Sequence, residues 1–115
     1  MNNLNHDKIR NKMLNSEELN EYLEKLGSKW KIDNENAKLF RKFNFLDFKQ
    51  VLEFTNLVGG LLNDLNRKPE LKLSYNKVEI HVNQSDKRLY QKDFEFAEEI
   101  NNKYYGYMKM IENYM

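Results

Sequence analysis

The stretch Asn66-Arg67-Lys68-Pro69-Glu70 separates two patterns of different periodicity and so decides the fold. An apolar run at helical spacing ends at about Leu65, and Leu71, Leu73 and Tyr75 then alternate with polar residues as in a half-buried strand. Proline fixes its own backbone and disfavours helix in the residue before it. The stretch therefore predicts a turn from a helix into a strand.

A long amphipathic helix is predicted before this turn, from Asp47 as its N-cap to about Leu65. Its apolar positions recur at helical spacing, at Phe48, Val51, Leu52, Leu57, Val58, Leu61, Leu62 and Leu65. The pair Gly59-Gly60 interrupts the pattern, and each glycine costs roughly 1 kcal/mol relative to alanine. We expect a close helix contact or a kink at this pair.

Two strands are predicted after the turn, within residues 71–83. The second alternation has the opposite phase to the first and is made by Val78, Ile80 and Val82. The slip in phase at Asn76-Lys77 predicts a turn or a bulge between the strands. His81 is out of phase with its apolar neighbours, so we expect it on the other side of the sheet.

The N-terminal half of the chain predicts one helix and two strands. Residues 1–14 have no apolar period and are expected to be a flexible tail before a single domain at 15–115. Asn15 and Glu18 have the spacing of a capping box, and Gly27 suits the end of the helix that follows. The two predicted strands cover Trp30-Lys31-Ile32 and residues 38–45.

A third amphipathic helix is predicted from Gln91 onward, with apolar positions at Phe94, Ala97, Ile100, Tyr104 and Met108. The complete order is α-β-β-α-β-β-α. This order favours an α+β fold in which a four-stranded antiparallel sheet carries three helices packed on one face.

Composition narrows the classes of function. The 115 residues suit one domain, and the net charge of +1 gives no basic footprint for nucleic acid. No apolar run approaches the length of a membrane span, so no membrane association is expected. The absence of cysteine excludes disulfides and thiolate metal sites. We expect an intracellular protein, and cytoplasmic within the cell.

Several short motifs resemble, in order and spacing, those of the pterin-4a-carbinolamine dehydratase family. They are Gly27-Ser28-Lys29-Trp30 before the first strand, Phe43-Asn44-Phe45-Leu46-Asp47-Phe48 between a strand and a helix, Pro69-Glu70 with Tyr75-Asn76-Lys77-Val78, and Leu89, Asp93 and Ala97 around the last helix start. The resemblance extends from about Leu19 to Ile100. It implies this family's fold, with the same order of elements.

The resemblance also locates an active site. It implies that catalytic members dehydrate 4a-hydroxytetrahydrobiopterin without metal or cofactor, and that three histidines move the protons. Histidine suits this task because it titrates near neutral pH. In this chain the three histidine positions are occupied by Arg67, Lys68 and Ser85, and the serine or threonine that caps the last helix is replaced by Tyr90.

The catalytic groups are therefore unknown, and the ligand-binding candidates are Arg67, Lys68, Pro69, Glu70, Ser85 and Asp93. A guanidinium stays protonated and cannot act as a base, and a lysine donates a proton at neutral pH only if burial lowers its pKa. Simpler interpretations are a solvated helix end for Arg67 and Lys68, a loop residue for Ser85, a surface charge for Glu70 and a helix cap for Asp93. His6 and His81 make no convincing metal site.

Two classes of function follow. The favoured one is a catalytically lapsed family member that acts through binding or self-association, since some relatives of this fold bind a transcription factor or assist the assembly of ribulose bisphosphate carboxylase. The alternative is an active dehydratase with substituted acid and base groups. The resemblance implies a homodimer or homotetramer, and a pterin or an unidentified protein is the expected partner. The cluster Tyr104-Tyr105-Gly106-Tyr107 indicates either self-association or core packing.

Overall fold

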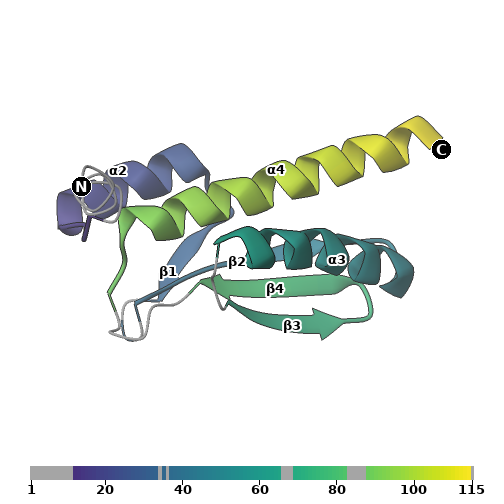
Figure 1. Cartoon of the computed structure of the whole chain (residues 1–115), viewed down its shortest axis with the longest axis horizontal. Coiled ribbons are helices and arrows are strands. Elements are labelled where there is room, and N and C mark those ends of the chain that lie inside the picture. Colours follow the sequence, from purple (N-terminus) through teal and green to yellow (C-terminus); the bar gives the residue numbers. More distant parts are fainter. Residues whose placement is uncertain (1–11, 34, 36, 66–68, 83–87, 115) are drawn as a thin grey trace.

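The computed structural model describes residues 12–33, 35, 37–65, 69–82 and 88–114. Its elements, in chain order, are α2 (Ser16–Leu26), β1 (Lys31–Asp33), β2 (Lys38–Asn44), α3 (Phe48–Leu65), β3 (Glu70–Ser74), β4 (Lys77–Val82) and α4 (Gln91–Tyr114) (Figure 1). The predicted order α-β-β-α-β-β-α is confirmed. No helix in the described ranges combines the length and the apolar character that a membrane span requires.

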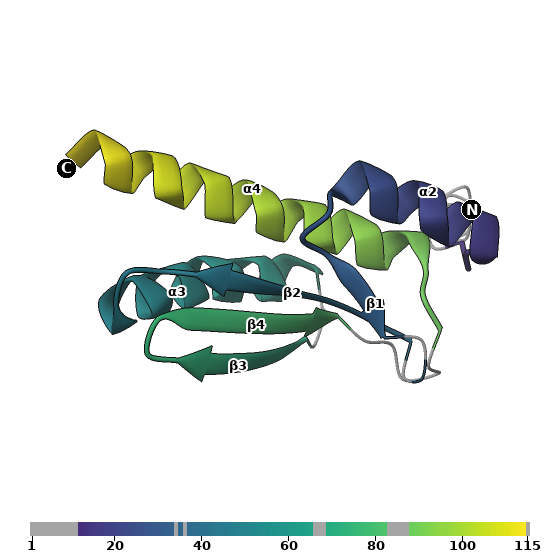
Figure 2. The same ribbon diagram turned by 180° about the vertical axis from the view of Figure 1, so that it is seen from behind.

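The four strands form one antiparallel sheet in the order β1-β2-β4-β3. The hairpin between β3 and β4 closes at Tyr75-Asn76, where Ser74 pairs with Lys77 (Figure 2). The slip in apolar phase therefore marks a turn. The backbone of Asn76 also accepts a hydrogen bond from Phe45 N at 2.8 Å, which ties the hairpin to the end of β2.

The core lies between the helices and one face of the sheet. Figures 1 and 2 show α3 and α4 on the same side of the strands, with α2 beside α4. Every second residue of β2 and β4 is buried against them, as alternation in a strand requires. The largest fully buried side chains are Trp30, Leu39, Phe43, Val51, Phe54, Val58, Val78, Ile80, Asp93, Phe96 and Ile100. The prediction of helices on one face is confirmed.

Helix α2 begins and ends as its sequence predicts. The side chain of Asn15 accepts a hydrogen bond from Glu18 N at 2.9 Å, and the Glu18 carboxylate accepts one from Asn15 N at 3.1 Å. The chain leaves the helix at Gly27, whose φ of 112° is a conformation that side chains disfavour. This glycine is therefore required by the backbone.

The prediction of a close contact at Gly59-Gly60 is wrong, and the alternative of a kink stays a prediction. Helix α3 runs without interruption through both positions. A Cβ atom added at either glycine would meet no atom within 4 Å, apart from the helix's own backbone. Neither position has a described neighbour that a methyl group would displace.

Part of the expected N-terminal tail pairs with the domain. Leu14 N donates to Leu89 O at 3.2 Å, Gln91 N donates to Lys12 O at 2.8 Å, and Leu14 is buried. This segment thus flanks the start of α4, and the folded domain includes residues 12–14. The tail stays a prediction for residues 1–11, which lie outside the described part of the chain.

A buried polar cluster joins three elements below α4. Arg41 on β2 is only 5% exposed, and its guanidinium donates to Asn101 Oδ1 at 2.8 Å. The Trp30 indole donates to the same oxygen at 2.7 Å, and the Asn101 amide donates to Leu26 O at 3.3 Å. The guanidinium also lies 4.3 Å from the centre of the Phe43 ring. Asn101 and aromatic rings, rather than a described carboxylate, therefore compensate this buried cation.

The tyrosine cluster on α4 divides between the core and the surface. Tyr107 is 4% exposed, and its hydroxyl donates to Glu53 Oε1 on α3 at 2.5 Å. Burial and this carboxylate raise the pKa of Tyr107 well above its ordinary value. Tyr105, in contrast, is 55% exposed. Core packing is thus the role of Tyr107, while Tyr105 is available at the surface.

Candidate functional site

The start of β3 and the end of β4 lie together at one end of the sheet. Glu70, the first residue of β3, is the Cα partner of His81 near the end of β4. Residues 66–68 immediately precede this pair of strands, and residues 83–87 immediately follow it. Antiparallel pairing thus brings the start of β3 and the end of β4 to the same end of the sheet. Arg67, Lys68 and Ser85 themselves lie outside the described residues.

Of the candidates at this edge, the structure describes Pro69 and Glu70. Pro69 is half-buried immediately before β3. Glu70 is exposed, and its carboxylate forms an ion pair with Lys38 Nζ on β2 at 3.8 Å. Exposed ion pairs of this kind contribute little to stability, typically about 0–1 kcal/mol. The location of Glu70 agrees with the surface-charge interpretation.

Asp93 is fully buried in the first turn of α4. Its carboxylate accepts a hydrogen bond from Tyr90 N at 2.7 Å, across three residues. This is the reverse half of a capping box, which satisfies a backbone N–H that the helix itself leaves unpaired. The capping interpretation of Asp93 is confirmed, and its contact with a pterin stays a prediction.

His81 lies on the face of the sheet that the described helices leave open. Its ring stacks on Phe40, its Cα partner in β2, with centroids 5.1 Å apart and planes 12° apart. Its Nε2 lies 2.5 Å from Glu79 Oε2. The hydrogen bond from His81 lowers the pKa of Glu79, and Lys42 and Lys72 act in the same direction.

The location of His81 was predicted only in part. Its phase in β4 placed it opposite Ile80 and Val82, and the structure confirms this. Its neighbourhood with Glu70 was missed, because that depends on the register between β3 and β4. Strand phase shows which residues of one strand share a face, while register shows which residues of two strands meet.

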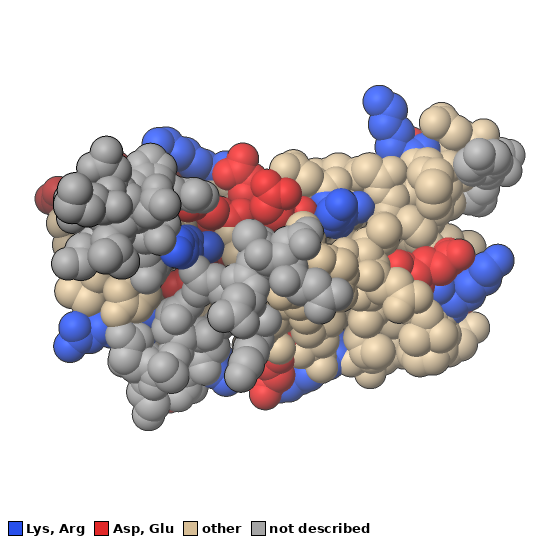
Figure 3. Space-filling model, in the orientation of Figure 1, with Lys and Arg blue, Asp and Glu red and all other residues tan. Residues whose placement is uncertain are grey.

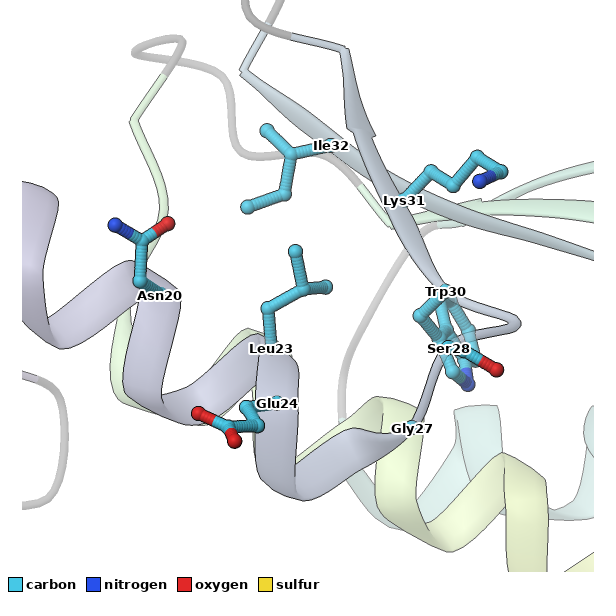
Figure 4. Close-up of a pocket in the computed structure, with 8 residues that line it drawn as sticks. All are labelled: Asn20, Leu23, Glu24, Gly27, Ser28, Trp30, Lys31 and Ile32. Carbon is cyan, nitrogen blue, oxygen red and sulfur yellow. The ribbon is translucent and has the colours of Figure 1, made fainter.

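A cavity between α2 and β1 lies away from this end of the sheet. It measures about 640 Å³, and Leu23 and Ile32 face one another across it (Figure 4). Asn20, Glu24 and Trp30 complete most of its wall. None of the described candidate residues lines it. Within the described ranges, no three histidine or acidic side chains gather as metal ligands would.

Comparison with known proteins identifies the family of this chain. The model of the family described as "Pterin 4 alpha carbinolamine dehydratase" matches residues 12–103, so the chain belongs to this family. A protein of Alkaliphilus metalliredigens named putative pterin-4-alpha-carbinolamine dehydratase is 34% identical over 88 residues, which are 76% of this chain and 78% of that protein. A relative of the same name in Rickettsia bellii is 34% identical over 76% of this chain and 77% of its own length.

Solved structures agree with this assignment. A transcriptional coactivator/pterin dehydratase from Brucella melitensis superposes with a TM-score of 0.73 at 25% identity, over 80% of this chain and 98% of that one. A pterin dehydratase-like protein identified as a RuBisCO assembly factor in the alpha-carboxysome superposes with a TM-score of 0.60. That match covers 68% of this chain and 92% of the other at 18% identity, so it supports the fold alone.

Proposed function

We propose that this chain is a pterin-4a-carbinolamine dehydratase-like protein that acts through binding or self-association and has lost efficient catalysis. The observation that carries the proposal is the pairing of Glu70 with His81. Because of this pairing, the two segments that bear Arg67, Lys68 and Ser85 adjoin the same end of the sheet. This pairing supports the proposal that the three changes from histidine affect one site.

The chemistry of those positions supports the loss of catalysis. A positioned general acid or base typically contributes about 10²–10⁴-fold to a rate. An arginine cannot exchange its proton at neutral pH, and a serine needs a neighbouring base to do so. His81, the one histidine in the described residues, already engages Phe40 and Glu79. Few groups that could transfer protons are therefore left at the site. Because the dehydration also proceeds in water without an enzyme, the chain is expected to accelerate it little.

Two features support a binding role. Chains of this fold include a protein titled as a transcriptional coactivator and one titled as an assembly factor, although a shared fold alone does not carry function. The surface over α3 and the C-terminal half of α4 is largely uncharged (Figure 3). Exposed apolar side chains of the two helices are Leu52 and Leu57 on α3 and Tyr105 and Met110 on α4. We propose this surface for a homodimer or homotetramer, or for a protein partner, inside the cell.

Dehydration of 4a-hydroxytetrahydrobiopterin tests the proposal. We expect the unmodified chain to give little acceleration over buffer. A variant with Arg67→His, Lys68→His and Ser85→His is the matched comparison, and a gain of activity would show that the pocket persists without its chemistry. Turnover by the unmodified chain at the level of an ordinary family member would overturn the proposal.

The alternative is an active dehydratase that recycles tetrahydrobiopterin with substituted acid and base groups. It is favoured by the match to residues 12–103 and by relatives that carry the dehydratase name at 34% identity. Ligand-binding candidates under either function are Arg67, Lys68, Pro69, Glu70, Ser85 and Asp93. Pterin binding measured beside turnover separates the two, because a lapsed member binds without turning over.

A further inference from the structure

The groove between α2 and β1 consists of two hollows that share one residue. The first is the cavity of about 640 Å³ in which Leu23 and Ile32 face one another (Figure 4). The second measures about 420 Å³, and its mostly apolar wall includes Leu19 on α2 and again Ile32. Because Ile32 borders both hollows, they lie next to each other along α2. We call the two hollows together the α2–β1 groove.

The walls of this groove are fixed by contacts elsewhere in the fold. Helix α2 has a capping box at its start, and Gly27 N donates to Leu23 O at 3.1 Å at its end. β1 pairs with β2, and the Trp30 indole just before β1 donates to Asn101 Oδ1 at 2.7 Å. The groove is therefore formed before a partner arrives, which lowers the entropic cost of binding.

The strand at the groove is an edge strand. In the sheet order β1-β2-β4-β3, β1 pairs with β2 alone among the described strands. The outer side of an edge strand presents backbone N–H and C=O groups that can pair with another chain. Extended peptides bind such edges by strand addition, with backbone hydrogen bonds for affinity and pockets for alternate side chains for specificity. The α2–β1 groove offers both.

The spacing of the two hollows suits an extended chain. Leu19 and Leu23 are four residues apart on α2, which is about 6 Å along the helix axis. Side chains two residues apart in an extended chain lie on the same side, about 6.6 Å from each other. Two apolar side chains at positions i and i+2 of a peptide thus match the two hollows, whereas a compact small molecule would occupy one of them.

The rim of the first hollow carries one charge of each sign. Glu24 on α2 and Lys31 on β1 are both exposed and line it. Neither forms an ion pair within the part of the chain that the structure describes. A basic residue of a partner is therefore favoured beside the helix and an acidic one beside the strand. Complementary charges of this kind fix the register of a bound segment.

We propose that the α2–β1 groove binds an extended segment of a partner protein by strand addition to β1. Two large apolar residues at alternate positions of the segment enter the two hollows, and a basic residue meets Glu24. The residues of this groove differ from the exposed apolar residues of α3 and α4. The inference involves no pterin and does not rest on the proposed function.

Peptide titration into the full chain tests the proposal. The probe is a short acetylated and amidated peptide in which two leucines alternate with threonines, followed by a lysine. We expect it to shift the backbone amide NMR signals of β1 and to change the fluorescence of Trp30, the single tryptophan. A peptide of the same composition with adjacent leucines should bind about tenfold more weakly, because one leucine stays in water. Equal affinities, signal shifts confined to other elements, or no binding at millimolar peptide would overturn the proposal.

Backbone pairing has its own readout. Two versions of the alternating peptide are N-methylated at alternate sets of amides, so that in each version the methyl groups lie on one edge of the extended chain. Only one of these edges faces β1 in a strand-addition complex. We expect one version to lose binding and the other to keep it, and equal binding of the two would refute strand addition.

A pair of charge variants tests the rim. Glu24→Lys should weaken binding of the alternating peptide about fivefold, because it replaces an exposed attraction by a repulsion. Exchange of the peptide's lysine for glutamate should restore the affinity. Glu21→Lys is the matched control, because Glu21 is exposed on the same helix and lines neither hollow. Equal losses in the two variants would show a general charge effect and contradict the site.

Two other occupants of the groove would give different results. If the chain's own N-terminal residues occupied it, the substitutions Leu4→Asp and Ile9→Asp would shift the amide signal of Ile32 without any peptide. If a second copy of the chain occupied it, the peptide would lower the mass measured by light scattering. We expect neither change, and either one would refute a partner segment as the occupant.

Discussion

At the scale of single residues, the buried side-chain amide of Asn101 connects three parts of the fold. Asn101 Oδ1 accepts hydrogen bonds from Trp30 and Arg41, and its amide donates to Leu26 O. These partners belong to α2, to β2 and to the segment before β1. A neutral side chain thus accepts hydrogen bonds from a buried guanidinium and from an indole N–H at the same time. In a buried network of this kind, a donor left without an acceptor lowers the stability of the fold.

Replacing Asn101 by alanine should destabilise the fold strongly. The change leaves the Trp30 N–H and one Arg41 N–H without an acceptor in a buried location, at a cost of about 3 kcal/mol. Urea unfolding monitored by the fluorescence of the single tryptophan measures the loss. The neighbouring Asn102→Ala is the control, because Asn102 is exposed, and should change stability by less than about 0.5 kcal/mol. Equal effects of the two substitutions would contradict the role of the cluster.

Glu79 should make stability depend on pH in a defined direction. Its pKa is lowered from 4.5 by the hydrogen bond from His81, so folding favours its ionised form. The resulting stabilisation is complete above the unfolded-state pKa and is lost as the pH falls through the lower folded-state pKa. The difference in unfolding free energy between the unmodified chain and Glu79→Gln should therefore shrink as the pH falls below 4.5. Urea midpoints across this range check it, and a constant difference would count against it.

At the scale of elements, the C-terminal end of α2 and the interior of α3 contain glycine for different reasons. Gly27 is needed because its φ of 112° disfavours any side chain. Gly59 and Gly60 are helical and have open space where a Cβ atom would go. The helix therefore carries the entropic cost of both glycines without a packing reason in the described structure.

Substituting alanine at Gly59 or at Gly60 should stabilise the protein. Each change removes backbone freedom from the unfolded chain without a clash, and should add about 0.5–1 kcal/mol. Thermal and urea unfolding of both single variants measure the gain. Gly27→Ala is the opposing control and should cost about 1–3 kcal/mol, because alanine is strained at that φ. A loss of stability at Gly59 or Gly60 would show a contact that the described residues do not reveal.

At the scale of the whole molecule, the helices cover one face of the sheet and leave two further surfaces for partners. The first is the open face with Phe40 and His81. The second is the largely uncharged surface of α3 and α4, where Leu52 is 45% exposed and Leu57 is 38% exposed. Exposed apolar side chains on helices that carry few charges are typical of interaction sites.

The double variant Leu52→Lys, Leu57→Lys should disrupt the proposed homo-oligomer. Two charges on this surface would have to be buried in the interface, whereas the monomer leaves them in water. Light scattering after size exclusion should show a fall from the oligomer's mass toward the 14.0 kDa of one chain. Leu73→Lys on the edge strand β3 is the comparison, since Leu73 is 42% exposed. If only Leu73→Lys caused dissociation, the interface would instead lie at the edge of the sheet formed by β3.

Much of the fold was predictable because its signals are local. The capping box of Asn15 and Glu18, the stop at Gly27 and the turn at Tyr75-Asn76 each depend on a few neighbouring residues. The site was predictable in a different way, through short motifs whose order resembles a family. That resemblance located Pro69 and Glu70 correctly at the start of β3. It gave Asp93 as a ligand-binding candidate, whereas the position of this residue in the first turn of the helix indicated the capping role that the Asp93–Tyr90 hydrogen bond shows.

The sequence by itself determined the order of elements, the buried faces of β2 and β4 and the family to which the chain belongs, because periodicity and short motifs are properties of neighbouring residues. Tertiary structure alone decided that Arg41 and Trp30 share Asn101, and that His81 lies beside Glu70 and under Phe40. Those contacts join residues far apart in the chain, and strand register and helix packing set them. The stretch Asn66-Arg67-Lys68-Pro69-Glu70 thus predicts the turn into β3, while the register between β3 and β4 pairs His81 with Glu70.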